Sequence, residues 1–384
     1  MRCDRCQEMV VEGVYCTRCG VRQGIPEELA SRVAWRGSYA AHPGEHVLQP
    51  SFFSTLFPQL DPAQRCEFCW TLLAGLATIA LLWIFGLIAA AILVAVGLLP
   101  VLYLLYLYAE QIDWRGWVLV MGLAVGAGVL LGIVTSFAAS LLRPPLGIGV
   151  GDVWGDVNSI DWLVLLGFGI SIPIIQEVVK PLPLLLLRRG NFSGVASGLT
   201  LGVAVGIGFS AALTVINFSA LLVGQDLRAM AGNWIFPLLT IALLQPVMQG
   251  ACTGLVAVAI WRKGDRIAVL GAVAGHLAFS LGSSLIGRFN LIGMLAWQMA
   301  VVLLLLVLVR YRLHSALLEE GRAEPLRDTT CPHCQKYILA AGFCPSCGLA
   351  LSVVPIARRS SWSGLTNESP ATAAFTASPD PEEA

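Results

Sequence analysis

The feature that most constrains this chain is a run of 39 residues without a charged side chain, Trp70–Tyr108. An α-helix rises about 1.5 Å per residue, so the run is roughly twice as long as one crossing of a ~30 Å hydrocarbon core requires. We interpret it as two membrane spans that break between Gly86 and Gly97. Six further apolar segments predict an all-α polytopic membrane protein with about eight transmembrane helices: Trp117–Leu142, Trp162–Leu187, Val195–Val223, Trp234–Ile260, Ile267–Ile286 and Leu291–Val309.

The distribution of charged residues supports this interpretation. Asp, Glu, Lys and Arg make up 12% of the 384 residues, compared with about 25% in soluble domains. Only 19 of these 48 residues lie within Cys69–Arg310, and the other 29 lie in the two flanks. The net charge is zero, so the global charge does not support a nucleic-acid partner. The composition instead predicts the lipid bilayer as a partner.

The loops between the spans predict the orientation. One side carries Arg188, Arg189, Arg262, Lys263, Arg266, Arg310 and Arg312, and the other carries Arg143, Arg228 and Arg288 beside three aspartates. The positive-inside rule places the first set in the cytoplasm. With an even number of spans, both termini are then cytoplasmic, and we expect a multi-pass protein of the cell membrane.

Eight of the eleven cysteines form a pattern that occurs once at each end of the chain. Two C-x2-C pairs are separated by nine residues, and a glycine follows the last cysteine. Four thiolates suit a tetrahedral zinc ion and leave no open coordination position, so we predict two structural zinc sites. Redox dithiols are the alternative, although one C-x2-C pair would serve that chemistry. The predicted ligands are Cys3, Cys6, Cys16 and Cys19, and Cys331, Cys334, Cys344 and Cys347.

Each unit resembles the zinc ribbons of many bacterial membrane proteins, which implies docking modules for protein partners. Cys66 and Cys69 border the first span without a second pair nearby, and we interpret them as reduced thiols in preference to metal ligands. The predicted organisation is a zinc ribbon at 1–20, a polar linker at 21–69, a membrane domain at 70–311, a linker at 312–330, a zinc ribbon at 331–348 and a disordered tail at 349–384.

Ionisable residues inside the predicted spans mark a candidate site, because each costs several kcal/mol in lipid unless it is paired or hydrated. Glu177 and Lys180 lie three residues apart on one helical face, next to prolines that predict a kink. His276 and Ser280 share a face of the seventh span. We expect Glu177, Lys180 and His276 to share one polar cavity. An internal ion pair with a histidine bridging two helices is the alternative reading.

Further polar and small residues lie in the neighbouring spans. Asn217 belongs to the fifth span and Gln249 to the sixth, and either side chain could bridge helices. The fifth span also carries a glycine at every fourth position, a spacing that lets another helix approach closely. This stripe predicts packing and comprises Gly194, Gly198, Gly202 and Gly206.

These segments, in this order, resemble the PrsW family of intramembrane metalloproteases, within the type II prenyl endopeptidases. The similarity covers roughly Leu98 to Val309. Gln176-Glu177-x2-Lys180 is similar to the family's Glu-Glu-x2-Lys, and His276-x3-Ser280 is similar to its final His-x3-Asn or Asp. The segment ending Gly206-Ile207-Gly208-Phe209 is similar to its glycine-rich entry into Phe-x3-Glu-Asn. The resemblance implies a catalytic role for Glu177, Lys180 and His276.

Several residues depart from the family pattern at the positions of its chemistry. Gln176 replaces the glutamate implied to be the general base, Leu213 and Thr214 replace Glu-Asn, and Gln249 stands where the other histidine is expected. A catalytic zinc needs about three protein ligands and a base, and a carboxamide accepts no proton at neutral pH. We therefore interpret the site as degenerate, in a protein that binds a membrane helix or protein partner without cutting it.

Two alternatives to this interpretation stay open. An active intramembrane zinc metalloprotease would hold a third zinc in the membrane core, with Asn217 or Gln249 completing a set begun by Glu177 and His276. A proton-coupled transporter would use Glu177, Lys180 and His276 as a proton relay.

Overall fold

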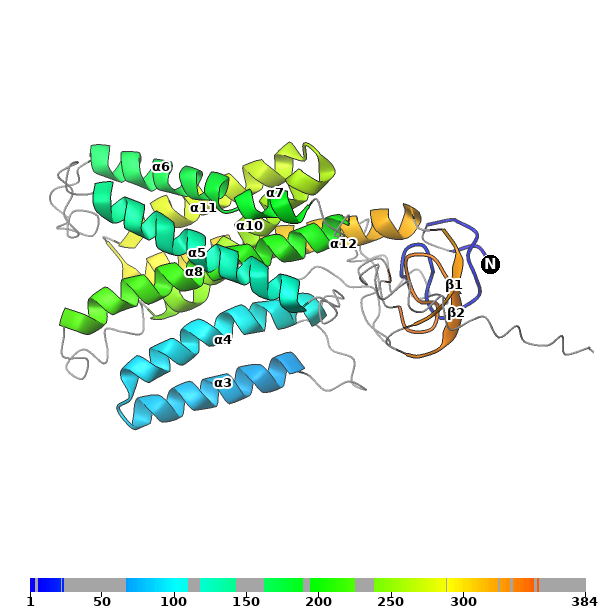
Figure 1. The fold of residues 1–384 in the computed structure, drawn as a ribbon, viewed down its shortest axis with the longest axis horizontal. Coiled ribbons are helices and arrows are strands. Elements are labelled where there is room, and N and C mark those ends of the chain that lie inside the picture. The colour runs from blue at the N-terminus through cyan, green and yellow to red at the C-terminus, as the bar shows by residue number, and fades with distance from the viewer. Residues whose placement is uncertain are drawn as a thin grey trace, which may run out of the picture.

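The computed structural model describes residues 1–3, 6–21, 23, 67–109, 118–142, 162–188, 194–224, 238–287, 289–323, 325–331, 334–348 and 351. Helices that run roughly along one direction form a bundle, and two small cysteine-containing units lie together at one end of it (Figure 1). The predicted tail at 349–384 and the linker at 21–69 lie almost entirely outside the described residues.

The long uncharged run forms two helices, α3 (Glu67–Ile84) and α4 (Ile88–Ala109). They pack against each other and are joined by a turn at Phe85–Leu87, at the edge of the interval in which we expected the break. Gly86 has a φ of 72°, a left-handed conformation that residues with a Cβ rarely adopt. The glycine therefore determines where the run divides.

The other apolar segments form helices close to their expected positions. Seven described helical segments are long and apolar enough to cross a membrane, and Trp70–Ile84 is a shorter apolar helix. The architecture is therefore multi-pass and helical, and the eighth crossing stays a prediction. These elements are α5 (Val118–Leu142), α6 (Trp162–Val179), α7 (Leu182–Leu187), α8 (Val195–Gly224), the π-helix η4 (Leu238–Leu244), α10 (Gln245–Arg262), α11 (Arg266–Gly287) and α12 (Leu291–Ala323).

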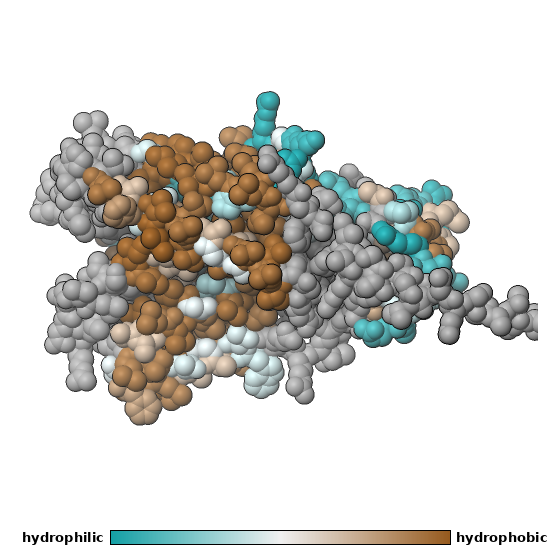
Figure 2. Space-filling view, in the orientation of Figure 1, coloured by the Kyte–Doolittle hydropathy of each residue, from teal (hydrophilic) through white to brown (hydrophobic). Residues whose placement is uncertain are grey.

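The described surface of the bundle is suited to lipid. Hydrophobic residues cover most of it in Figure 2, whereas hydrophilic residues gather toward the end that carries the cysteine units. Large apolar side chains such as Leu119 and Leu186 are more than 70% exposed. A surface of this kind would aggregate in water and is stable when hydrocarbon covers it.

The centre of the bundle is α8, which packs mainly against α10 and α5. Three glycines of the predicted stripe, Gly198, Gly202 and Gly206, face α10, whereas Gly194 lies against Glu320 of α12. A Cβ on Gly202 would lie 2.6 Å from the Cβ of Ala257, and one on Gly206 would lie 2.8 Å from the Cα of Gly250. The two backbones are thus in direct contact, which only glycine permits.

The last helix differs from the expectation. We predicted a span ending at Val309 and a linker over 312–330, whereas α12 continues to Ala323 and is followed by a strand. At about 1.5 Å per residue its 33 residues extend roughly 20 Å beyond a ~30 Å core. Buried Leu313, Ala316 and Leu317, at helical spacing, keep the extension packed although the sequence there is charged.

Ion pairs hold this extension to the same end of the bundle. Arg312 Nη1 lies 2.8 Å from Asp265 Oδ2, and Arg262 Nη2 lies 3.0 Å from Glu319 Oε1. Glu320 Oε1 accepts a 2.9 Å hydrogen bond from the amide of Ala196, in the first turn of α8. The loop between α10 and α11 and the start of α8 are therefore fixed to α12.

Two compact units contain the repeated cysteines. The first cysteine unit comprises the described residues among 1–23, and the second comprises those among 325–351. In the second unit β1 (Arg327–Thr330) pairs antiparallel with β2 (Tyr337–Ala340), with Arg327 opposite Ala340. The second unit extends past its predicted end, because Leu351 is buried and its amide donates to the carbonyl of Gly342 at 2.7 Å.

We predict that Gly128→Ala destabilises the bundle, because a Cβ there would collide with the carbonyl of Val205 in α8. Overpacking of this kind costs about 1–3 kcal/mol. Gly126 lies on the same helix with open space around its Cβ position, so Gly126→Ala is the matched control and should be neutral or stabilising. Thermal unfolding of both variants in detergent checks this, and equal midpoints would contradict the α5–α8 contact.

Candidate functional site

A cluster of five polar side chains lies among the apolar helices. α6 and the residue after it supply Gln176, Glu177 and Lys180, α10 supplies Gln249, and α11 supplies His276. Four of them are buried, with 0% exposure at Lys180 and 3% at Glu177 and His276. The structure thus brings together the three residues that we expected in one polar environment, together with Gln176 and Gln249, two of the four further polar residues that we expected there.

Lys180 is the centre of the cluster. Its Nζ donates to Glu177 Oε1 at 2.5 Å and to Gln249 Oε1 at 2.5 Å. The ring of Phe209 from α8 lies with its centroid 5.8 Å from Nζ and adds a cation–π contact. The ammonium group is therefore paired with a carboxylate and hydrogen-bonded by protein groups.

The remaining contacts define the tautomer of the histidine. His276 Nδ1 lies 2.7 Å from Glu177 Oε1, and an ionised carboxylate only accepts, so Nδ1 carries the proton. Nε2 then accepts from Gln249 Nε2 at 3.4 Å. The second hydrogen of the same amide goes to Gln176 Oε1 at 3.2 Å. Both hydrogens and the oxygen of the Gln249 amide are used.

Proline chemistry places Lys180 at the end of α6. Its amide still completes a helical bond to the carbonyl of Gln176, at 3.0 Å. Pro181 has no amide hydrogen and cannot continue the helix, so a short turn leads into α7. The predicted kink therefore lies directly after the Glu177–Lys180 pair and keeps both side chains on the inner face.

Other predicted site residues lie apart from these hydrogen bonds. Ser280 follows His276 on α11 but takes no part in the bonds described above, and its carbonyl accepts from Ser284. Thr214 is buried and donates to the carbonyls of Ser210 and Ile241 at 2.9 and 3.2 Å. Asn217 lies in α8, but its side chain is outside the described residues, as are Cys66 and the side chain of Cys69.

A polar contact between α11 and α12, separate from the cluster above, was not predicted. Gln298 is 4% exposed and donates to Ser283 Oγ at 2.8 Å, while Trp297 Nε1 donates to the carbonyl of Ala278 at 2.8 Å. One glutamine and one serine in long apolar helices carry no distinctive spacing. Only the pairing of the two helices shows that these residues meet.

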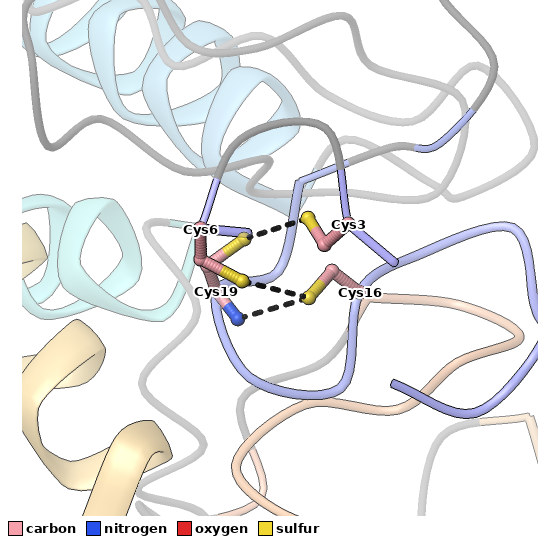
Figure 3. Close-up of side chains that lie close together, drawn as sticks. All are labelled: Cys3, Cys6, Cys16 and Cys19. Atoms are coloured by element: carbon pink, nitrogen blue, oxygen red, sulfur yellow. Dashed lines mark hydrogen bonds between the residues drawn. The ribbon is translucent and has the colours of Figure 1, made fainter. Parts of the chain in front are cut away.

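Each cysteine unit gathers four sulfur atoms. In the first, the Sγ atoms of Cys3, Cys6, Cys16 and Cys19 point toward one another (Figure 3) and lie within 4.8 Å of each other. Cys3 Sγ is 3.7 Å from Cys19 Sγ, and Cys331 Sγ is 3.6 Å from Cys347 Sγ. Among the described residues, these are the two groups of at least three His, Cys, Asp or Glu that could hold a metal ion.

The thiols of the first unit are not electrostatically equivalent. A hydrogen bond from Cys19 lowers the pKa of Cys16 to about 5, with help from the amides of Arg18 and Cys19, both 3.4 Å from its sulfur. Burial raises the pKa of Cys6 to about 11. Cys16 therefore loses its proton more readily than Cys6. A bound cation would favour ionisation of the remaining thiols.

Comparison with models of protein families, with curated proteins and with solved structures finds no match for this chain.

We predict that Glu177→Gln destabilises the bundle, because it leaves the buried Lys180 ammonium without its counter-charge. Breaking a buried pair from one side typically costs about 3–5 kcal/mol. Lys180→Met in the same chain removes the stranded charge, so the double variant should regain most of the loss. Thermal unfolding of the two single variants and the double variant in detergent measures this. Additive losses would show that the two side chains are not energetically coupled.

Proposed function

We propose that this protein is a PrsW-like membrane protein whose core binds a membrane helix or protein partner without hydrolysing it. The observation that carries the proposal is that Lys180, Glu177 and His276 are bonded to one another and to Gln249. Glu177 Oε1 is shared by Lys180 and His276, and the lone pair of His276 is taken by Gln249. Glu177 Oε2 is buried and accepts no hydrogen bond from the described residues, but the carboxylate and the imidazole together offer at most two metal ligands, fewer than the roughly three protein ligands that a catalytic zinc needs.

The placement of the substituted residues supports the family resemblance. Gln176 and Gln249, which differ from the family pattern, both belong to the polar cluster. Leu213 lies one helical turn after Phe209, whose ring contacts Lys180, and is therefore on the same face of α8. Gln176 and Gln249 thus lie beside Glu177, Lys180 and His276, as expected if a catalytic centre had lost its chemistry there, whereas Thr214 bonds to Ile241 apart from the cluster.

We further propose that each cysteine unit holds one structural zinc ion. At a zinc–sulfur distance of about 2.3 Å, a regular tetrahedron places its sulfurs about 3.8 Å apart. The separations of 3.6–3.8 Å between paired sulfurs fit this geometry. A disulfide would need about 2.05 Å, so the thiols are reduced. Four sulfur ligands leave no open position for catalysis, which makes the predicted role structural.

Both termini are proposed to face the cytoplasm of a cell membrane. The two cysteine units touch each other, and the basic residues Arg262 and Arg312 lie at the bundle end from which α12 extends toward them. Units in contact lie on one side of the bilayer, which requires an even number of crossings. The shorter helix α3 would then cross as well.

We predict that epitope tags at the two termini react with antibody only after cells are permeabilised. The contact between the units supports one side of the bilayer for both termini, and the positive-inside rule favours the cytoplasmic side. A tag inserted between α5 and α6, on the opposite side, is the control and should react in intact cells. A terminal tag that reacts in intact cells would rule out the proposed topology.

We predict that the unaltered protein does not cleave a reporter carrying a transmembrane helix, because Gln176 cannot accept a proton as a base and the amide of Gln249 is already bonded to Lys180, Gln176 and His276. The triple variant Gln176→Glu, Leu213→Glu and Gln249→His restores the family pattern, and any cleavage that it gains should require Glu177. Immunoblotting of the reporter measures both. Cleavage by the unaltered protein that is lost in His276→Ala would instead establish the active metalloprotease.

A further inference from the structure

The two cysteine units fold alike, residue for equivalent residue. In the first, the amide of Cys3 donates to the carbonyl of Glu8 at 3.0 Å, and in the second that of Cys331 donates to Lys336 at 2.9 Å. The glycine after the last cysteine has a positive φ in both, 66° at Gly20 and 74° at Gly348. The units are therefore two copies of one small fold.

The copies contact each other through equivalent residues, in both directions. Tyr15 and Phe343 each stand directly before the third cysteine of their unit. The amide of Tyr15 donates to the carbonyl of Pro345 at 2.9 Å, and that of Phe343 donates to the carbonyl of Thr17 at 3.0 Å. Since Thr17 and Pro345 also occupy equivalent positions, the interface has the reciprocity of a two-fold dimer.

The aromatic rings of Tyr15 and Phe343 also pack across the interface, each against the other unit. A Cβ on Gly348 would lie 2.9 Å from the ring of Tyr15, and a Cβ on Gly20 would lie 2.8 Å from the ring of Phe343. Tyr15 is 1% exposed and Phe343 is fully buried. Each ring therefore packs on the turn that ends the other unit's set of cysteines, and that turn keeps its shape only while its thiolates are gathered.

We propose that the two units form one clasp with two zinc ions, in which each ion is retained because the other unit is folded. The proposal rests on the zinc loading proposed above. A unit of about 20 residues buries too little apolar surface to fold alone, so it depends on its metal and on its neighbour. Loss of zinc from one unit removes the turn that covers the other unit's aromatic ring, and the clasp that joins the two ends of the chain opens.

The release of zinc from the full-length protein to a colorimetric chelator tests the coupling. Cys6→Ser leaves only the second site intact, and Cys334→Ser leaves only the first. If the sites are independent, the wild-type time course equals the sum of the two variant time courses. The clasp predicts that the remaining ion in each variant leaves on the order of tenfold faster than any ion in the wild type. A variant that is purified without either ion shows the same coupling in its extreme form.

Variants that keep all eight thiolates provide the second measurement. Tyr15→Ala and Phe343→Ala should each accelerate release of both ions. Met9 and Tyr337 occupy equivalent positions that are 75% and 61% exposed, so Met9→Ala and Tyr337→Ala are matched controls and should behave like the wild type.

The outcomes separate the two proposals. Acceleration of only one of the two ions, or an additive wild-type time course, overturns the clasp and leaves zinc loading intact. A purified wild-type protein without zinc overturns the zinc loading itself.

Discussion

The burial of one charge constrains the arrangement of the membrane helices. Lys180 has no exposed surface, and an ammonium group without partners in an apolar interior would cost many kcal/mol. Its partners come from α6 and α10, and the carboxylate that neutralises it is itself held by His276 of α11. Three helices must therefore keep their register for the charge to be tolerated, and moving any of them strands a polar group.

Close packing of the helix backbones lets the side chains of this network reach one another. A Cβ on Gly206 would collide with the carbonyl of Gln249, so the glycine lets α10 lie directly against α8 at the level of the cluster. Gln249 then reaches Lys180 while Phe209 covers the ammonium from the other helix. The glycine stripe carries no chemistry, yet a larger residue there would separate the helices that supply the polar groups.

The sequence was informative where a physical cost could be read from single residues. Glu177, Lys180 and His276 stand out in apolar spans because ionisable side chains are costly in lipid, and the spacing of the C-x2-C pairs predicts the two groups of four cysteines that the structure brings together. The continuation of α12 was missed, because the charges after Arg310 resemble a linker and only packing reveals the buried face of Leu313 and Leu317. The packing of Tyr15 on Gly348 and of Phe343 on Gly20 could not be predicted either, since neither aromatic residue has a signature and the contact between the units depends on the whole fold.

The two ends of the chain are connected to the polar cluster through α12. Arg312 and Glu320 tie this helix to the loop before α11 and to the start of α8, so it cannot rotate without breaking an ion pair and a capping bond. It packs along α11, which carries His276. The second cysteine unit follows α12 after a few residues and holds the first by reciprocal bonds. A partner that displaced the units would thus act on a helix packed against one wall of the polar cluster, and that path gives a regulatory role for the units a physical basis.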